Sequence, residues 1–163
     1  ELSDQIPETV LYNVEHVRVK DGRVILSMEA GKAENYDQLK ETRLSNLLFR
    51  EYDRDGVIAT EGRADSAVLN LETDDATISG NLQVYSAKDE AFILAQELYW
   101  KDEQKQLTAK EQSLVELRTS EGNSIRGSGF SADFNDRSVT FAGGARGSYL
   151  IEESAGDEEE TNQ

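Results

Sequence analysis

The fold is decided near the start of the chain by residues 9–26, which read TVLYNVEHVRVKDGRVIL. Valines alternate with polar and charged residues there, and a second apolar run follows after Asp21-Gly22. Alternation with a period of two is typical of a strand that is buried on one face. An Asp-Gly pair between two such runs is the strongest short-range signal for a β-hairpin. The stretch therefore predicts two antiparallel strands joined by a tight turn.

The same hairpin pattern recurs along the chain at a regular spacing. Its turns lie at positions 22, 56, 90 and 122, which are 34, 34 and 32 residues apart. A pair of alanines repeats as well, since Ala30 and Ala33 match Ala64 and Ala67 at a spacing of 34. A period of 20–50 residues indicates copies of one supersecondary unit. We therefore expect about four copies of a hairpin-like unit, each a few short strands long.

Composition limits the function. A chain of 163 residues predicts one domain. The net charge of −16 argues against a nucleic-acid-binding protein, because such proteins need Lys and Arg to neutralise phosphates. The chain has no cysteine and one histidine, His16, which excludes disulfides, thiolate catalysis and metal sites built on cysteine or on two histidines. We therefore expect no cofactor and no metal, whereas a hydrolase that uses paired carboxylates stays formally possible at this point.

Short strands of 5–8 residues with one dry face predict an all-β sandwich, barrel or jelly roll, in which two sheets lie about 10 Å apart. In residues 91–101 the expected inner face carries Phe92, Leu94, Leu98 and Trp100. Residues 101–118 are rich in helix formers, and propensity alone predicts a helix there. The phase of the repeat predicts strand, turn and strand instead, and we follow the repeat because propensity is the weaker signal.

Three local motifs have a functional and a structural interpretation. Asp53–Gly56 resembles the start of a calcium loop, but the flanking strands favour a hairpin turn. Gly143–Gly147 resembles a phosphate-binding loop, but no helix follows, so close backbone approach or a bulge is the better interpretation. His16 alternates with valines and is expected on a solvated face. Residues 152–163 carry six acidic residues and no basic residue, which predicts a disordered tail.

Several segments together resemble the LptC branch of the OstA-like family, which also includes LptA. The likeness runs from about residue 9 to residue 150. Each segment is weakly specific by itself, whereas their order and spacing are more specific. The segments are Leu44-x-Asn46 leading through Tyr52–Gly56, Ile78-x-Gly80-Asn81-Leu82-x-Val84, Leu98–Trp100, Ile125–Asp133 and Phe141–Tyr149.

The resemblance implies an open, twisted β-jelly roll of antiparallel strands over residues 9–151. Residues 1–8 would lead from a membrane anchor that this chain lacks, and residues 152–163 would form the acidic tail. The implied function is non-catalytic: a periplasmic protein, tethered to the inner membrane, that passes lipopolysaccharide from an inner-membrane ABC transporter towards the outer membrane. Two alternatives stay open, namely a soluble LptA-like bridge protein and a structural cell-envelope β-repeat module with a filled core.

The resemblance and the expected faces together suggest where lipid and partners bind. An LptA-like jelly roll would meet the C-terminal edge, and an LptB/LptF/LptG-type ABC transporter would meet the N-terminal edge around Thr9–Val17. The expected groove residues are Leu48, Leu69, Leu71, Ile78, Leu82, Val84, Ile93, Leu94, Phe130, Phe134 and Phe141. The expected partner-edge residues are Val139, Phe141, Gly143, Gly144, Gly147 and Tyr149.

Overall fold

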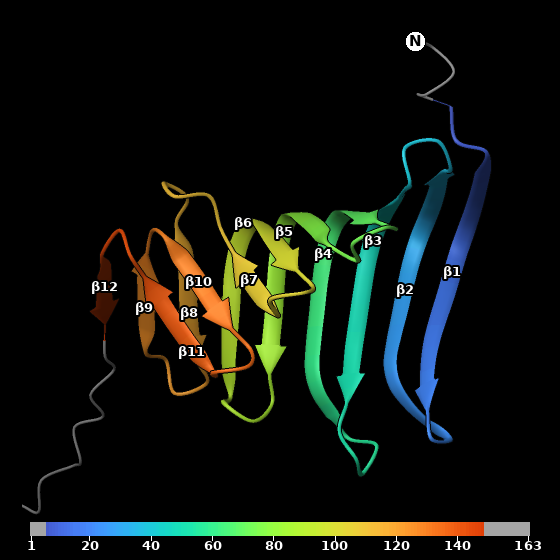
Figure 1. Cartoon of the computed structure of the whole chain (residues 1–163). Helices are drawn as coiled ribbons and strands as arrows, with labels where there is room; N and C mark the ends of the chain where they lie inside the picture. Colours follow the sequence, from blue (N-terminus) through green and yellow to red (C-terminus); the bar gives the residue numbers. More distant parts are fainter. Residues whose placement is uncertain (1–5, 149–163) are drawn as a thin grey trace, which may run out of the picture.

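The structure is a computed structural model that describes residues 6–148, and within them it is entirely β (Figure 1). The described part holds no helix, so the strand interpretation of residues 101–118 is confirmed, and none of its elements is a helix able to cross a membrane. The strands are β1 (Thr9–Lys20), β2 (Arg23–Tyr36), β3 (Glu41–Tyr52), β4 (Ile58–Asn70), β5 (Ala76–Ser86), β6 (Ala91–Lys101), β7 (Gln106–Thr108), β8 (Val115–Thr119), β9 (Ser124–Gly127), β10 (Phe130–Asp133), β11 (Ser138–Phe141) and β12 (Ala145–Ser148).

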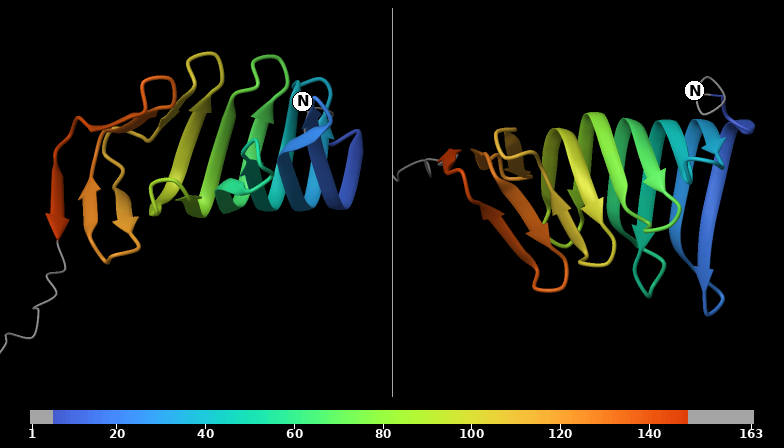
Figure 2. Two further views of the ribbon diagram at one scale, coloured as in Figure 1. Left: turned by 90° about the horizontal axis from the view of Figure 1, so that it is seen from below. Right: turned by 45° about the horizontal axis from the view of Figure 1, so that its top comes forward.

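All twelve strands belong to one antiparallel, hydrogen-bonded sheet. Strands β1 to β6 pair in chain order, and beyond β6 the sheet divides into two branches. One branch continues through β7, β10 and β11, and the other continues through β8, β9 and β12. The expectation of two separate sheets is therefore wrong for β1 to β6. A single sheet folds over on itself there and becomes two layers, as the curved ribbons of Figure 2 show.

The sheet bends over along a row of residues that interrupts the pairing of neighbouring strands. Asn13, Gly31, Asn46, Asp65 and Gly80-Asn81 have no partner in the ladders, although the residues on both sides of them do. We call this row the corner. Asn13, Asn46, Gly80 and Asn81 have positive φ angles between 46° and 84°. Such left-handed residues turn the chain and reverse which side chains face inward.

The corner explains why the strands are longer than the expected 5–8 residues. Strands β1 to β6 contain 11–14 residues, because each one runs through both layers. The β12 layer contains residues 14–20, 23–30, 47–52, 58–64, 82–86 and 91–95 with β8, β9 and β12. The β11 layer contains residues 9–12, 32–36, 41–45, 66–70, 76–79 and 98–101 with β7, β10 and β11. One 34-residue repeat is thus two bent strands and two turns.

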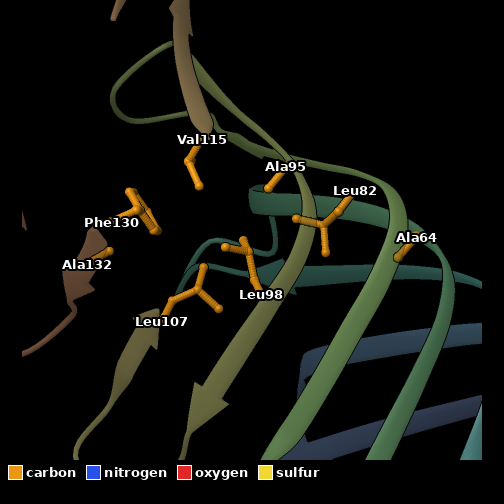
Figure 3. Packing of buried hydrophobic residues seen from close by; sticks show 8 residues of the cluster. All are labelled: Ala64, Leu82, Ala95, Leu98, Leu107, Val115, Phe130 and Ala132. Atoms are coloured by element: carbon orange, nitrogen blue, oxygen red, sulfur yellow. The ribbon is translucent and has the colours of Figure 1, made fainter. Parts of the chain in front are cut away.

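The repeated alanines lie directly beside the corner. Ala30 and Ala33 in β2 and Ala64 and Ala67 in β4 are all buried, and they alternate with the larger Leu44 and Leu47 of β3. Small side chains on alternate strands let the two layers approach closely, while leucines fill the space between them. Near β4 to β10 the layers enclose a second cluster, in which Leu82, Leu98, Val115 and Phe130 point towards one another (Figure 3).

Candidate functional site: the mouth between the layers

A row of apolar side chains lines the inner face of the β12 layer, one step outward from the corner. Its members occupy directly paired positions on neighbouring strands, so they share one face of the sheet. We call it the mouth row, and it crosses β2, β3, β4, β5, β6, β8 and β9. At a strand separation of about 4.8 Å it is roughly 29 Å long. Its side chains are Met28, Phe49, Val84, Ile93, Leu117 and Ile125, with Gly62 between Phe49 and Val84.

The mouth-row side chains are partly exposed to solvent, whereas the apolar side chains that lie deeper between the two layers are buried. Leu82, Leu98, Val115 and Phe130 are each less than 2% exposed and form the floor between the layers. The mouth-row side chains are only partly buried, and Ile125 at the β9 end is 41% exposed. The centre of the molecule is therefore a packed core, and the accessible apolar surface lies above it.

Phe49 bridges the gap that glycine leaves in the mouth row. Its ring lies over Gly62, and a β-carbon at Gly62 would overlap the ring. The missing side chain therefore lets Phe49 cover the backbone of β4, and the apolar surface continues from Phe49 to Val84 without a polar interruption.

Most of the expected groove residues lie on the inner face. Leu82 and Phe130 belong to the buried floor, and the others on this face pack against the two core clusters. Those others are Leu69, Ile78, Val84, Ile93 and Phe141.

Two expected groove residues lie on the outer face. Leu94 pairs with Gln83, and Leu48 pairs with Glu29 and Arg63. The expectation that Phe92 and Leu94 share a face with Leu98 and Trp100 is wrong, because the inner set of β6 is Ile93, Ala95, Leu98 and Trp100. The phase changes at Gln96 and Glu97, where β6 crosses from one layer to the other, and alternation alone does not show such a change.

The remaining two groove candidates lie in turns at the rim. Leu71 follows β4 and Phe134 follows β10, and each is 51% exposed. The Phe134 ring packs edge-on against Trp100, with 5.4 Å between ring centroids. The Trp100 Nε1–H donates a hydrogen bond to Asp102 at 3.1 Å. This end of the β11 layer is thus an aromatic rim with polar neighbours rather than part of the floor.

The C-terminal partner-edge candidates serve two different purposes. Val139 in β11 is 48% exposed on an edge strand, and Gly147 lies in the other edge strand, β12. Gly143 and Gly144 lie in the connection between these strands: a β-carbon at Gly143 would overlap the Ser128 Oγ atom, and Gly144 has a φ of +95°. Gly143 alone makes a close approach within the chain, of the kind that the glycine pattern predicted, whereas a β-carbon at Gly144 would lie in open space. Tyr149 lies outside the described residues, as do residues 152–163.

The N-terminal edge is β1, which pairs only with β2 within the described chain. It exposes apolar side chains on both faces, including Leu11 at 47% and Tyr12 at 70%. Leu11 lies on the inner face, since it pairs with the buried Ala33. An unpaired strand with apolar side chains is a surface that another sheet can extend.

Ion pairs and hydrogen bonds join several of the polar side chains on the outer surface. Arg50 lies between Glu61 and Glu29, with N···O distances of 2.7 and 3.2 Å. In β6, Glu97 accepts hydrogen bonds from Tyr99 and Lys110, which lower the pKa of its carboxyl group. The Asp53 carboxylate accepts the N–H groups of Asp55 and Val57 in the β3–β4 connection, so the hairpin-turn interpretation of this motif is confirmed.

Sequence reasoning missed four members of the mouth row: Met28, Phe49, Leu117 and Ile125. Met28 and Phe49 continue the alternation of Ala30 and Leu47, which lie two residues away along their strands. That alternation was the available signal, but it becomes useful only when the position of the corner is known.

Comparison with known proteins agrees with this architecture. Residues 1–150 match the family described as "Lipopolysaccharide-assembly, LptC-related", which covers all the described strands. A search among curated proteins finds no match. With the open antiparallel sheet folded into two layers, the match shows that the chain belongs to the family of LptC-related lipopolysaccharide-assembly proteins.

Proposed function

We propose that the chain is a non-catalytic bridge component that binds the acyl chains of lipopolysaccharide along the mouth row. The observation that carries this proposal is the continuity of that row, which is apolar and partly exposed from Met28 to Ile125. Removal of acyl chains from water is favourable, and each buried CH₂ group contributes about 0.8 kcal/mol to the free energy of binding. A track roughly 29 Å long therefore offers substantial affinity to a lipid lying along it.

The packed floor makes this binding shallow. Since Leu82, Leu98, Val115 and Phe130 already fill the space between the layers, acyl chains lie on the floor and remain exposed on one side. Partial burial keeps the affinity low enough for release, which a carrier requires. The same packed floor favours the second candidate, a structural β-repeat module with a filled core, and the experiment below separates the two.

The open edges support a place within a chain of jelly rolls. At the C-terminal end, Ile125 and Val139 leave apolar surface uncovered on the inner faces of the two layers, and at the N-terminal end Leu11 does the same. A neighbouring sheet added to such an edge would extend both the hydrogen bonding and the apolar surface. In this proposal an LptA-like protein joins β11 and β12, and an LptB/LptF/LptG-type transporter at the inner membrane joins β1.

Photocrosslinking at neighbouring residues of one strand tests lipid binding. Adjacent residues in a strand point to opposite faces, so Val84 and Ile93 face the mouth whereas Gln83 and Leu94 face outward. We expect photoreactive residues at 84 and 93 to capture lipopolysaccharide, and those at 83 and 94 to capture little. Matched pairs on β5 and β6 keep the local sequence and the folding constant.

The result separates the two candidates. Capture from the mouth positions that competes with unlabelled lipopolysaccharide supports the carrier. Equal capture from both faces, or no capture at 84 and 93 in a folded protein, favours the structural module.

A further inference from the structure

The edge strand β1 places two basic side chains on the inner face of the sheet, beside the mouth row. His16 pairs directly with Met28, and Arg18 pairs directly with Leu26. Met28 packs against a core cluster, as does Val14 two residues before His16, so these positions belong to the inner face. His16 is exposed, as expected of a solvated histidine, but it lies on the inner face and not on the polar face that the alternation suggested. Both basic side chains are exposed, and they form the N-terminal end of the apolar track.

Eight of the seventeen lysines and arginines, all of which lie within residues 6–148, form an ion pair with a carboxylate, and His16 and Arg18 belong to the basic residues that do not. Lys32, Arg43, Arg50, Lys101 and Lys105 each form an ion pair with a carboxylate. Within residues 6–148, neither His16 nor Arg18 forms an ion pair or a side-chain hydrogen bond. The His16 imidazole and the Arg18 guanidinium are therefore available to bind an anion from solution.

The acidic groups that face this pair are few. Glu51 lies two strands away and shares a face with Arg18, because both residues pair directly with Leu26. Asp102 lies across the mouth: its pKa is lowered, mainly by the hydrogen bond from Lys105 and least by the charge of Arg18. Since Lys105 already holds the Asp102 carboxylate at 2.9 Å, that carboxylate leaves Arg18 largely unneutralised.

We propose that His16 and Arg18 form a binding site for a phosphate group carried by the glycolipid. An amphiphile whose acyl chains lie along Met28 and Phe49 would bring its head group to the end of this row, beside the two basic side chains. Arginine is well suited to this role because its planar fork of donors matches phosphate oxygens. The inference rests on the proposed function, since it assigns the polar part of the same ligand.

Binding of two lipid A preparations, one with its phosphates and one enzymatically dephosphorylated, tests this site. The variant is Arg18→Gln, and the matched control is Arg63→Gln, which removes one positive charge from an exposed residue on the outer face. We expect Arg18→Gln to weaken binding of the phosphorylated lipid about tenfold, since an exposed charge-assisted contact contributes modestly. Binding of the dephosphorylated lipid is expected to stay unchanged, and His16→Gln should act in the same direction.

Salt dependence gives a second readout. Wild-type affinity for the phosphorylated lipid should fall between 50 and 300 mM salt by more than that of Arg18→Gln, because salt screens the exposed charge pair. Inorganic phosphate at millimolar concentration should compete with the phosphorylated lipid only.

Three outcomes would overturn the inference. Arg18→Gln and Arg63→Gln could weaken binding equally, Arg18→Gln could weaken both lipids equally, or wild type could bind both lipids with equal affinity at low salt. In the last two cases the proposed lipid carriage stands without the phosphate site. Failure of wild type to bind either lipid would overturn the proposed function and this inference together.

Discussion

Gly62 shows how one missing side chain shapes the candidate site. The Phe49 ring occupies the space that a β-carbon at Gly62 would take. The glycine has no positive φ, so backbone strain plays no part and the requirement is one of space alone. The apolar continuity of the mouth row therefore depends on this pair.

Gly62→Ala is expected to force Phe49 out of the mouth row and to lower the free energy of unfolding by about 1–3 kcal/mol, the usual cost of overpacking. Urea unfolding measures this. Gly147→Ala is the control, since a β-carbon there meets only ordinary contacts at 3.4 and 3.7 Å. The double variant Phe49→Leu/Gly62→Ala should recover part of the loss. A Gly62→Ala protein as stable as wild type would show that the ring moves aside freely.

Asp133 is a second residue with a defined energetic role. Its carboxylate accepts the N–H groups of Asp136 and Asn135 at 2.9 Å and a hydrogen bond from Gln106 at 3.2 Å. These bonds, led by that from Asp136, lower the pKa of Asp133. A depressed folded-state pKa means that this stabilisation is present above the unfolded value near 3.9 and is lost as the pH falls through the folded value.

Asp133→Asn should therefore lower the urea midpoint at pH 7, and the difference from wild type should shrink as the pH falls below about 4. Urea titrations at pH 7, 4 and 3 measure this. Asp136→Asn is the control in the same turn, because the Asp136 carboxylate accepts no hydrogen bond from residues 6–148. A difference that stays constant with pH would contradict the role of the charge.

At the scale of the strands, the corner decides the architecture. Asn46 and Asn81 tolerate left-handed backbone better than most residues, because their short polar side chains bond locally. Asn81 donates a hydrogen bond from Nδ2 to Asp65 at 2.9 Å, which links two strands at the corner. Without this row the long strands would run straight, and the sheet would have one wet and one dry face but no interior.

Two glycines at the corner have different requirements, which gives a matched pair of substitutions. Gly80 has a φ of +84°, and a β-carbon there would lie 2.5 Å from the Asp65 Oδ2 atom. Gly31 has no positive φ, and its nearest neighbour would be the Asn46 Nδ2 atom at 3.3 Å. We expect Gly80→Ala to cost about 1–3 kcal/mol through backbone strain, and Gly31→Ala to cost clearly less. Equal losses in chemical denaturation would contradict the larger requirement for glycine at Gly80.

At the scale of the whole molecule, the folded sheet stays open at both ends. As an LptC-related protein, the chain acts in lipopolysaccharide transport in the cell envelope, and the edges bear on how it meets its partners.

Gly144 is unsuitable for testing the C-terminal edge, because its N–H bonds to Phe141 and its positive φ excludes proline. Val139 is the better position. Ala142 donates inward to Gly129, and N–H groups alternate along a strand, so the Val139 N–H points to the open side.

Val139→Pro should abolish capture of an LptA-like jelly roll in a pull-down assay while the monomer stays folded, because proline removes an edge donor and is tolerated on edge strands. Val139→Thr keeps both the β-branched shape and the N–H, and it should retain most of the binding. Undiminished capture by Val139→Pro, with a normal circular dichroism spectrum, would exclude edge pairing through β11.

The sequence by itself determined the class of fold, the repeat and the turns. Asp-Gly pairs, two-residue alternation and the 34-residue spacing are local features, and their consequences for backbone conformation are local as well. The family resemblance also came from short segments in order. These features placed Leu82 and Val84 on the inner face correctly, whereas the alternation in residues 91–101 placed Phe92 and Leu94 there in place of Ile93.

Only the tertiary structure decided where the alternation reverses and what covers each face. Leu48, Leu94 and His16 have the same local patterns as inner or outer residues elsewhere, and their side was set by corner residues that shift the phase by one position. The separation into a packed floor and an open mouth depends on packing between strands far apart in the chain, as in the cluster that contains both Leu82 and Phe130. Alternation with a period of two shows which residues of a strand share a face. A one-residue shift moves that whole set to the other face, and only packing selects between the two faces.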